Sequence, residues 1–342
     1  MIILIDALFI NNGGGKELLD YLVENTRSYN SVHFLFDERV KGHYDFLPSD
    51  RVVFLKGSLI KRHMFYLKNR SKFNIILCFG NFPPTIKLNT KVYTYFHNVL
   101  LIKTTSFYKI KSRILFWIKG WLIKLFKSNT DFWIVQTNIV KLELANNWEV
   151  DQNQILILPI FKSDIGLINN KSTAFLSRSK IQFLYVSDGH PYKNHSLLID
   201  AFIELYSRYK CVELIVTIGN NYPELQNRIE RLTQNGVPII NIGLIPKKKL
   251  IEYYLNSDIF IFPSLVESFG LGMIEAAQFE MPIIASNLPY VHEVIRPMIT
   301  FNQNSMESML SAMVEVINSK PEKPEIIVKN ELNKLIELLI TQ

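Results

Sequence analysis

Two glutamates, Glu267 and Glu275, stand on either side of a short turn that contains Gly270. Strand-forming residues lead into this turn and a helix-forming run leads out of it, so we expect a helix to begin near the glycine. The start of a helix presents unpaired backbone N–H groups and a positive dipole end, which together attract an anion. Glu275 lies about one turn inside the helix, so both carboxylates can face one ligand. A nucleotide sugar has the required hydroxyls and phosphates. One glutamate near a helix start is explained by the dipole alone, but the paired arrangement is more specific.

A second polar turn, residues 186–195, follows a strand-like run and precedes a helical pattern. Its lysine, Lys193, stands where a point charge can pair with a diphosphate. A solvent-exposed lysine in a polar loop is the ordinary alternative. The position at the end of a strand favours a role in binding.

The first half of the chain offers two weaker candidates. Residues 11–16 include three consecutive glycines, whose backbone can approach a phosphate or a sugar closely, although a plain tight turn explains them equally well. His97 ends a strand-like run, where it can hydrogen-bond a sugar hydroxyl or lie beside a reacting centre. A core or capping histidine is the alternative.

Residues 111–127 alternate apolar residues, including Trp117 and Trp121, with lysines and an arginine at helical spacing. Such a basic amphipathic helix fits an anionic membrane surface. An ordinary domain helix with its apolar face turned inward is an equally good interpretation.

Short apolar runs alternate with helical patterns along the whole chain, which predicts α/β architecture with parallel sheets. We expect two doubly wound domains, residues 1–165 and 166–325, which face each other across a ligand-binding cleft, and a closing helix at residues 326–342. The expected strands are 2–6, 32–36, 52–55, 74–79, 92–96, 132–136, 155–158, 182–186, 213–218, 239–242, 259–262 and 282–285.

The bulk composition narrows the class of protein. With 342 residues and 48% hydrophobic content the chain can fill two cores. Its net charge of +7 suggests an anionic partner, but nucleic-acid-binding motifs are missing. Two cysteines, Cys78 and Cys211, lie in apolar runs and are expected to be buried reduced thiols. No leader or membrane-spanning run is apparent, so we expect a cytoplasmic protein.

Several chemistries lack their sequence motifs. No Asp-x-Asp, H-E-x-x-H or Cys/His cluster predicts a metal, and no G-x-S-x-G predicts a serine hydrolase. Neither half carries the G-x-G-x-x-G fingerprint with its ribose-binding acid, which disfavours a dinucleotide-dependent dehydrogenase.

Taken together, these residues resemble the retaining glycosyltransferases of family 4, which have the two-domain GT-B fold. The resemblance is strongest over residues 181–293 and includes the E-x7-E segment from Glu267 to Glu275. The first half is similar more loosely, through the glycines, residues 95–98 and residues 135–137. One departure is Asp188, because many relatives carry an arginine near this position as a second phosphate-binding cation.

The resemblance implies a role for each matching residue. Glu275 would accept hydrogen bonds from the ribose, Lys193 would neutralise the departing diphosphate, and Glu267 would orient the donor sugar. His97 would sit beside the anomeric carbon. The remaining donor-binding residues implied are Gly14, Gly15, Ser187, Gly243, Ile245, Phe269, Gly270 and Leu271.

We therefore expect a retaining, metal-independent enzyme without a cofactor. It would move a hexose from a nucleoside-diphosphate sugar to a saccharide acceptor, expected to be lipid-linked and at the inner membrane face, in surface polysaccharide biosynthesis. A nucleotide-sugar epimerase of the same fold is the first alternative, and a non-catalytic saccharide-binding protein is the second.

Overall fold

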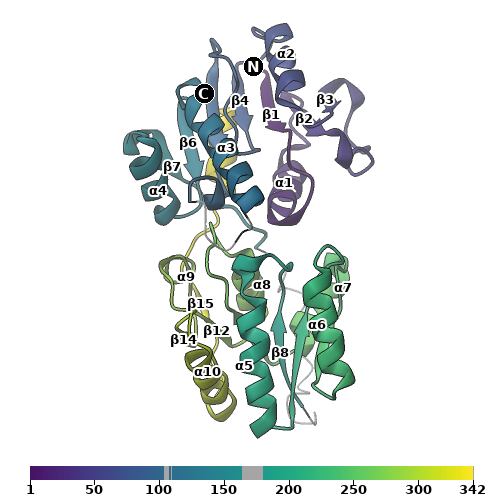
Figure 1. Ribbon diagram of the computed structural model, residues 1–342. Coiled ribbons are helices and arrows are strands. Elements are labelled where there is room, and N and C mark those ends of the chain that lie inside the picture. The colour runs from purple at the N-terminus through teal and green to yellow at the C-terminus, as the bar shows by residue number, and fades with distance from the viewer. Residues whose placement is uncertain (104–107, 109, 164–179, 342) are drawn as a thin grey trace. The chain divides into compact units, whose positions relative to one another are not determined.

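The computed structural model describes residues 1–103, 108, 110–163 and 180–341. The chain divides into two compact units (Figure 1). Residues 1–162 and 329–342 make the first unit, and residues 163–328 make the second. Among the described residues, no helix is long and apolar enough to cross a membrane.

The first unit is built on a seven-stranded parallel sheet in the order β3-β2-β1-β4-β5-β6-β7. Its central strands are buried along their whole length and, apart from Asp6, consist of apolar residues, as expected of parallel strands between helical layers. The strands are β1 (Ile3–Ala7), β2 (Val32–Asp37), β3 (Val52–Leu55), β4 (Ile75–Cys78), β5 (Lys91–Tyr95), β6 (Phe132–Val135) and β7 (Ile155–Ile157). The helices are α1 (Gly13–Thr26), α2 (Leu59–Lys68), α3 (Ile110–Leu125), α4 (Asn138–Trp148) and α11 (Leu332–Ile340).

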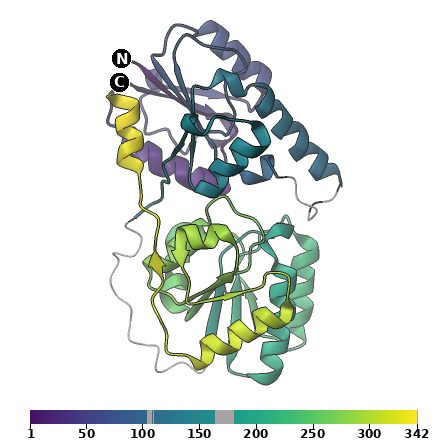
Figure 2. The same ribbon diagram turned by 90° about the vertical axis from the view of Figure 1, so that its left-hand side faces the viewer.

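The crossovers decide which face of this sheet each helix covers. The chain moves from β3 to β4 and from β5 to β6 in one direction along the sheet, and from β1 to β2 in the other. Because such crossovers are right-handed, α2 and α3 lie on one face and α1 lies on the opposite face. Figure 2 shows α2 and α3 on the right-hand side of the first unit, away from the yellow α11.

The second unit has a six-stranded parallel sheet in the order β10-β9-β8-β11-β12-β14. Its strands are β8 (Ile181–Tyr185), β9 (Val212–Val216), β10 (Ile239–Asn241), β11 (Ile259–Phe262), β12 (Ile283–Ser286) and β14 (Ile299–Phe301); β13 (Ile295–Arg296) and β15 (Glu325–Ile326) form a small antiparallel pair. Its helices are α5 (His195–Arg208), α6 (Pro223–Gln234), α7 (Lys247–Asn256), α8 (Leu271–Gln278), α9 (Pro289–Val294) and α10 (Met306–Asn318).

The α/β architecture and all twelve expected strands are confirmed, with ends that differ by a residue or two. Three details of the prediction were wrong. The closing helix begins at Leu332 and not at Ile326, because Ile326 pairs with Ile295 and the Asn330 side chain accepts from the Leu332 N–H. The three short strands β13, β14 and β15 were not predicted. Cys211 is exposed, whereas Cys78 is buried as expected.

Candidate functional site

The polar residues of the second unit gather at one edge of its sheet. Because its six strands are parallel, the loops that follow β8, β9, β10 and β11 all leave from the carboxyl edge, where ligands bind in doubly wound folds. These loops carry Ser187 and Lys193, Thr217, Gly243, and Glu267 respectively.

The loop after β8 is held in place by its neighbours. The Ser187 N–H donates to Thr217 Oγ1 at 2.8 Å, and the Thr217 hydroxyl donates back to the Ser187 carbonyl at 3.0 Å. A short 3-10 turn (Pro191–Lys193) follows, and Asn194, in the left-handed conformation, leads into α5. The Tyr185 hydroxyl donates to the Lys193 carbonyl at 2.8 Å. The backbone of Lys193 is therefore fixed by a buried tyrosine from β8.

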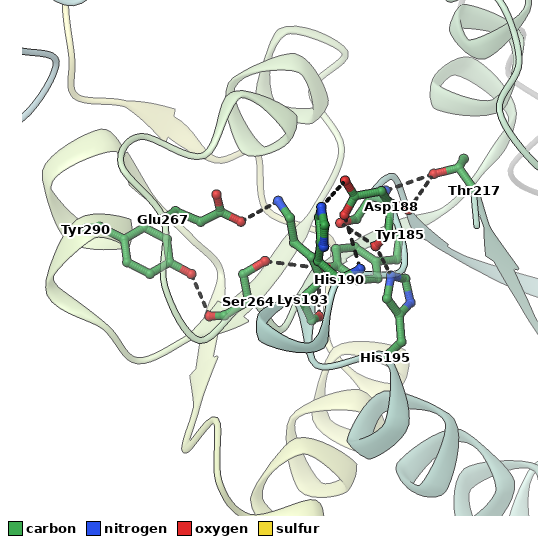
Figure 3. Close-up of polar contacts among 10 residues, drawn as sticks. Tyr185, Asp188, His190, Lys193, His195, Thr217, Ser264, Glu267 and Tyr290 are labelled. Carbon is green, nitrogen blue, oxygen red and sulfur yellow. Dashed lines mark hydrogen bonds and ion pairs between the residues drawn. The ribbon is translucent and has the colours of Figure 1, made fainter. Parts of the chain in front are cut away.

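The same tyrosine connects this loop to the one after β11. The Tyr185 hydroxyl lies 3.0 Å from Ser264 Oγ, and the Tyr290 hydroxyl donates to the Ser264 carbonyl at 2.7 Å (Figure 3). The Leu265 N–H also donates to the Tyr192 carbonyl at 2.8 Å. Two segments about 70 positions apart in sequence are thus joined through backbone and buried side chains.

Lys193 and Glu267 form an ion pair across the two loops. Lys193 Nζ lies 2.6 Å from Glu267 Oε1, and the two side chains are only 16% and 14% exposed (Figure 3). A pair so far removed from solvent is screened less than a surface pair. The structure thus brings together the lysine and the first glutamate of the predicted motif.

Glu275 is also held by a lysine, which was not predicted. Lys247, in the first turn of α7, contacts Glu275 Oε1, and the Tyr254 hydroxyl donates to Glu275 Oε2 at 2.8 Å. The Glu275 carboxylate is nearly buried on α8. The sequence gives no local signal for Lys247 or Tyr254, because both belong to a different helix from the motif.

The start of α8 lies between the two glutamates in sequence and has no side-chain cap. Gly270 occupies the N-cap position with φ +88°, and no acidic residue stands in the first turn. A Cβ at Gly270 would lie 2.5 Å from the Met273 side chain. Glycine is therefore favoured by the backbone conformation, whereas the contact is with the terminal methyl of a flexible side chain that can shift. Phe269, which precedes this glycine, is buried in the core.

The loop after β10 completes this edge. Gly243 has φ +66°, and its N–H donates to Asn241 Oδ1 at 3.1 Å. Ile245 is half-buried, whereas Leu244 is 74% exposed and lies against Gly219. The exposed side chain of Leu244, beside these glycines, can pack against a flat ring. Leu244 was not among the predicted site residues.

Asp188, which stands near the position of the relatives' arginine, takes part in a histidine cluster. Its carbonyl accepts from His195 Nε2 at 2.7 Å, and its carboxylate Oδ2 lies 3.5 Å from His190 Nε2 (Figure 3). Burial lowers the pKa of His195 to about 4, so this imidazole is neutral at pH 7. Asp188 therefore orders the loop and supplies no cation.

The candidates of the first unit lie at the carboxyl ends of its own strands. The helix α1 starts at Gly13, so Gly14 and Gly15 are in its first turn and not in a loop before it. A Cβ at Gly15 would come within 2.9 Å of the His97 ring, which packs against the helix start. His97 Nε2 lies 3.2 Å from both the Phe79 carbonyl and Asn81 Nδ2.

Burial lowers the pKa of His97 to about 4. This histidine is consequently a neutral hydrogen-bonding group at pH 7. The Asn81 side chain also accepts from the His97 N–H at 2.7 Å, and Asn81 itself has φ +66°. Asn81 is a further residue that sequence reasoning missed.

Among the described residues, no cluster of histidine, cysteine, aspartate and glutamate has the arrangement of a metal site.

Comparison with known proteins identifies the second unit. Residues 169–334 match the family model described as glycosyl transferases group 1. Most of the second unit is therefore similar to the glycosyltransferase group 1 domain. The prediction of a glycosyltransferase is confirmed at the level of this domain.

Curated proteins that are similar to this chain include an uncharacterized protein and a mannosyltransferase. An uncharacterized 41.2 kDa protein in the cps region of Klebsiella pneumoniae is 25% identical over 75% of this chain and 63% of its own length. The serotype-specific mannosyltransferase WbdA of Escherichia coli is 32% identical over 33% of this chain and 14% of its own. The chain thus spans less than two thirds of the first curated relatives that it matches.

Solved structures extend the likeness of fold to both units. A glycosyltransferase from Rickettsia africae ESF-5 gives a TM-score of 0.71 with 16% identity, covering 99% of this chain and 97% of its own. The Anabaena protein HepE, solved in complex with UDP, gives 0.72 with 12% identity, covering 99% and 95%. These neighbours confirm the predicted GT-B type of fold, with two Rossmann-like units.

Proposed function

We propose that the protein is a retaining, metal-independent glycosyltransferase, which moves a hexose from a nucleoside-diphosphate sugar to a saccharide acceptor. The observation that carries the proposal is the carboxyl edge of the second sheet. There the uncapped start of α8 stands in sequence between Glu267 and Glu275, each of which is held by its own lysine.

The diphosphate of the donor is proposed to bind Lys193 and the start of α8. Both are positive at this edge, and departure of a nucleoside diphosphate needs charge stabilisation that a preorganised lysine and helix end can supply. Lys193 is paired with Glu267 at 2.6 Å, so the phosphate oxygens would share or replace this contact. Glu267 would then be free to accept hydrogen bonds from the donor sugar. The proposed roles of Glu267 and Lys193 are therefore coupled, because the two side chains form one ion pair.

The nucleoside is proposed to bind around Glu275. A carboxylate has about four lone-pair directions, so Glu275 can accept from a ribose hydroxyl while it keeps its contacts with Lys247 and Tyr254. Gly243 to Ile245, with the exposed Leu244, would lie against the base. Lys247 would orient the Glu275 carboxylate, and it is the cation that we add to the predicted set. Ser187 would contribute by holding the loop after β8 in place, because its N–H and carbonyl are both bonded to Thr217.

The first unit is proposed to bind the acceptor. The neutral imidazole of His97, placed against the start of α1 at Gly15, is suited to a hydrogen bond with a sugar hydroxyl. The relatives named as O-antigen and serotype-specific mannosyltransferases support an acceptor from surface polysaccharide assembly and a mannosyl donor as the first to test. We propose a lipid-linked acceptor and, accordingly, a cytoplasmic enzyme peripheral at the inner membrane face, which the basic helix within 111–127 would contact.

A thermal-shift panel of uridine, guanosine and adenosine diphosphates tests the donor site. Ligand that binds only the folded state stabilises it by RT ln(1 + [L]/Kd), so one nucleotide should raise the melting temperature and Glu275→Ala should abolish that rise. The panel is run with and without EDTA, and a shift that needs a divalent metal would contradict metal independence. An undiminished shift in the Glu275 variant would remove this residue from the site.

Product analysis separates the proposal from its alternatives. An epimerase would convert the nucleotide sugar without any acceptor, and a saccharide-binding protein would give no turnover at all. A glycosyltransferase releases nucleoside diphosphate in proportion to the new glycoside. The anomeric coupling of that glycoside in the NMR spectrum reports retention or inversion.

A further inference from the structure

The charge of this chain is strongly segregated along the sequence. Residues 51–130 contain 16 lysines and arginines and not one aspartate or glutamate. The remainder of the chain contains 22 lysines and arginines against 31 acidic residues. The whole positive balance of the protein therefore comes from one stretch, which runs from β3 to the end of α3 in the first unit.

The helix α3 turns its apolar stripe outward. Ile114, Trp117, Ile118, Trp121 and Leu125 follow one side of the helix at spacings of three and four, and all are exposed; Trp117 is 61% and Trp121 is 53% exposed. The opposite side packs inward through Gly120 and Ile123, and Gly120 lies directly against the Leu101 carbonyl. The ordinary interpretation of this helix, an apolar face turned into its own domain, is thus wrong for most of its apolar residues.

The helix α2 has the same construction. Arg62 and Tyr66 point inward, where the Arg62 guanidinium pairs with Asp6 at 2.7 Å and is fully buried. The outer side carries Ile60, Met64 and Leu67 at spacings of four and three, and Ile60 is 77% exposed. The buried ion pair anchors α2 to the sheet and leaves an apolar stripe in solvent.

Cations flank both stripes. Lys61 and Lys68 on α2, and Lys111, Arg113 and Lys119 on α3, are exposed and have no acidic partner among the residues that the structure describes. Because α2 and α3 cover the same face of the sheet (Figure 2), their stripes and cations belong to one surface, which we call the α2–α3 face.

We propose that the α2–α3 face docks in the plane of an anionic lipid bilayer, with α2 as a second contact beside α3. This deepens the proposed function, since it concerns how the enzyme reaches a lipid-linked acceptor. Exposed tryptophans and branched aliphatic residues flanked by lysines match the boundary between acyl chains and anionic head groups. A protein partner with an apolar groove would match the stripes, but it would not require 80 residues without one acid.

Vesicle binding of the full chain is the test. Sedimentation with vesicles of phosphatidylglycerol and phosphatidylcholine, against pure phosphatidylcholine, should show binding only to the anionic mixture and a steep loss with added salt. Tryptophan emission should shift to the blue on binding, and this shift reports Trp117 and Trp121, because the other two tryptophans, Trp133 and Trp148, are buried. The emission measurement needs no variant.

Three sets of variants then test the contribution of each helix and of the lysines. Replacing Trp117 and Trp121 by serine should weaken vesicle binding about tenfold or more. Replacing Ile60, Met64 and Leu67 by serine should weaken vesicle binding by a similar factor. Replacing Lys61 and Lys68 by serine should weaken it about fivefold for each charge. The matched controls are Ile240→Ser, an exposed apolar residue of the second unit, and Lys210→Ser, an exposed lysine there; both should bind as the unchanged chain does.

The outcomes are distinct. Normal vesicle binding by the variant with Ile60, Met64 and Leu67 replaced would overturn the contribution of α2 to the α2–α3 face. Equal binding to neutral and anionic vesicles would overturn the preference for anionic lipid. A concentration-dependent dimer that the α3 variant abolishes, without vesicle binding, would make the face an interface between copies and overturn the proposal. The nucleotide thermal shift of each variant should be unchanged. Absence of vesicle binding by the unchanged chain, with an intact nucleotide shift, would sink only the docking. Vesicle binding by the unchanged chain without any nucleotide shift would sink only the proposed donor chemistry.

Discussion

Removing the charge of Glu267 should tighten the binding of the nucleoside diphosphate while it prevents transfer. In the structure the Lys193 ammonium is occupied by the Glu267 carboxylate at 2.6 Å. A diphosphate that uses Lys193 must compete with this contact. The substitution Glu267→Gln keeps the size and hydrogen-bonding capacity of the side chain but removes the competing charge.

The size of the effect follows from the strength of that contact. A hydrogen bond to a charged partner contributes about 1.5–3 kcal/mol and a neutral one about 1 kcal/mol. Freeing Lys193 from the amide of Glu267→Gln therefore costs about 0.5–2 kcal/mol less than freeing it from the carboxylate, which corresponds to a Kd lower by about 2–30-fold. Lys193→Ala should act in the opposite direction. It removes the cation itself and should raise the Kd by about 10–150-fold.

Isothermal titration with the nucleotide selected by thermal shift measures both constants, and a coupled assay of nucleoside diphosphate release measures transfer. Glu204→Gln is the control, because Glu204 makes a similar 2.7 Å ion pair with Arg208 on the exposed side of α5. It should change neither quantity. If Glu267→Gln weakened nucleotide binding as much as Lys193→Ala does, the two residues would act on the diphosphate together, and the competition argued here would be refuted.

Three further predictions concern single residues. Gly270→Ala should lower the free energy of unfolding in urea by about 1–2 kcal/mol and weaken nucleotide binding, because Gly270 has a positive φ and the Met273 side chain occupies the position of the new Cβ. The control Gly236→Ala has a similar φ and open space around its Cβ, so it should show the stability cost alone. Equal nucleotide binding by the two variants would contradict a role for the start of α8. Tyr254→Phe removes the 2.8 Å hydrogen bond to Glu275, so it should lower the free energy of unfolding by about 1 kcal/mol and reduce the thermal shift caused by the nucleotide. An unchanged nucleotide Kd would show that Tyr254 does not position Glu275 for binding. The pKa of His97 is lowered from 6.5 to about 4 in the folded protein, so the unfolded chain takes up the proton at a higher pH than the folded chain does. The free energy of unfolding therefore falls as the pH drops from 6.5 toward 4, by about 2 kcal/mol between pH 7 and pH 5. In urea titrations His97→Gln should lose about 2 kcal/mol less stability over this range than the unchanged protein.

The elements of the fold were predictable because their signals are local. Each strand is a short apolar run between polar turns, and each was found within a residue or two. The strands β13 and β15 were missed since two paired residues leave no periodic pattern. The helix α1 begins within the run of three glycines, because Gly13 alone takes a positive φ and the other two glycines are helical.

The candidate site was predictable only where its residues share a motif. Glu267, Gly270 and Glu275 lie within nine positions, so their spacing carries information. Lys247 reaches Glu275 from another helix, and nothing in the local sequence of α7 distinguishes this lysine from its neighbours. The outward orientation of α3 was hidden for a related reason. Periodicity reveals that a stripe exists, but the side that packs inward is decided by Gly120 fitting against a carbonyl elsewhere in the chain.

The return of the chain to the first unit has a practical consequence for protein engineering. The backbone leaves that unit after Lys162 and rejoins it at Lys329, where the Glu331 N–H donates to the Pro159 carbonyl and Asn330 contacts Tyr21. The second unit is therefore an insertion, and a chimaera that swaps donor preference between relatives needs two junctions instead of one. A fragment truncated before α11 would lose the three leucines that this helix buries, so both fusion points should be kept whenever either half is exchanged.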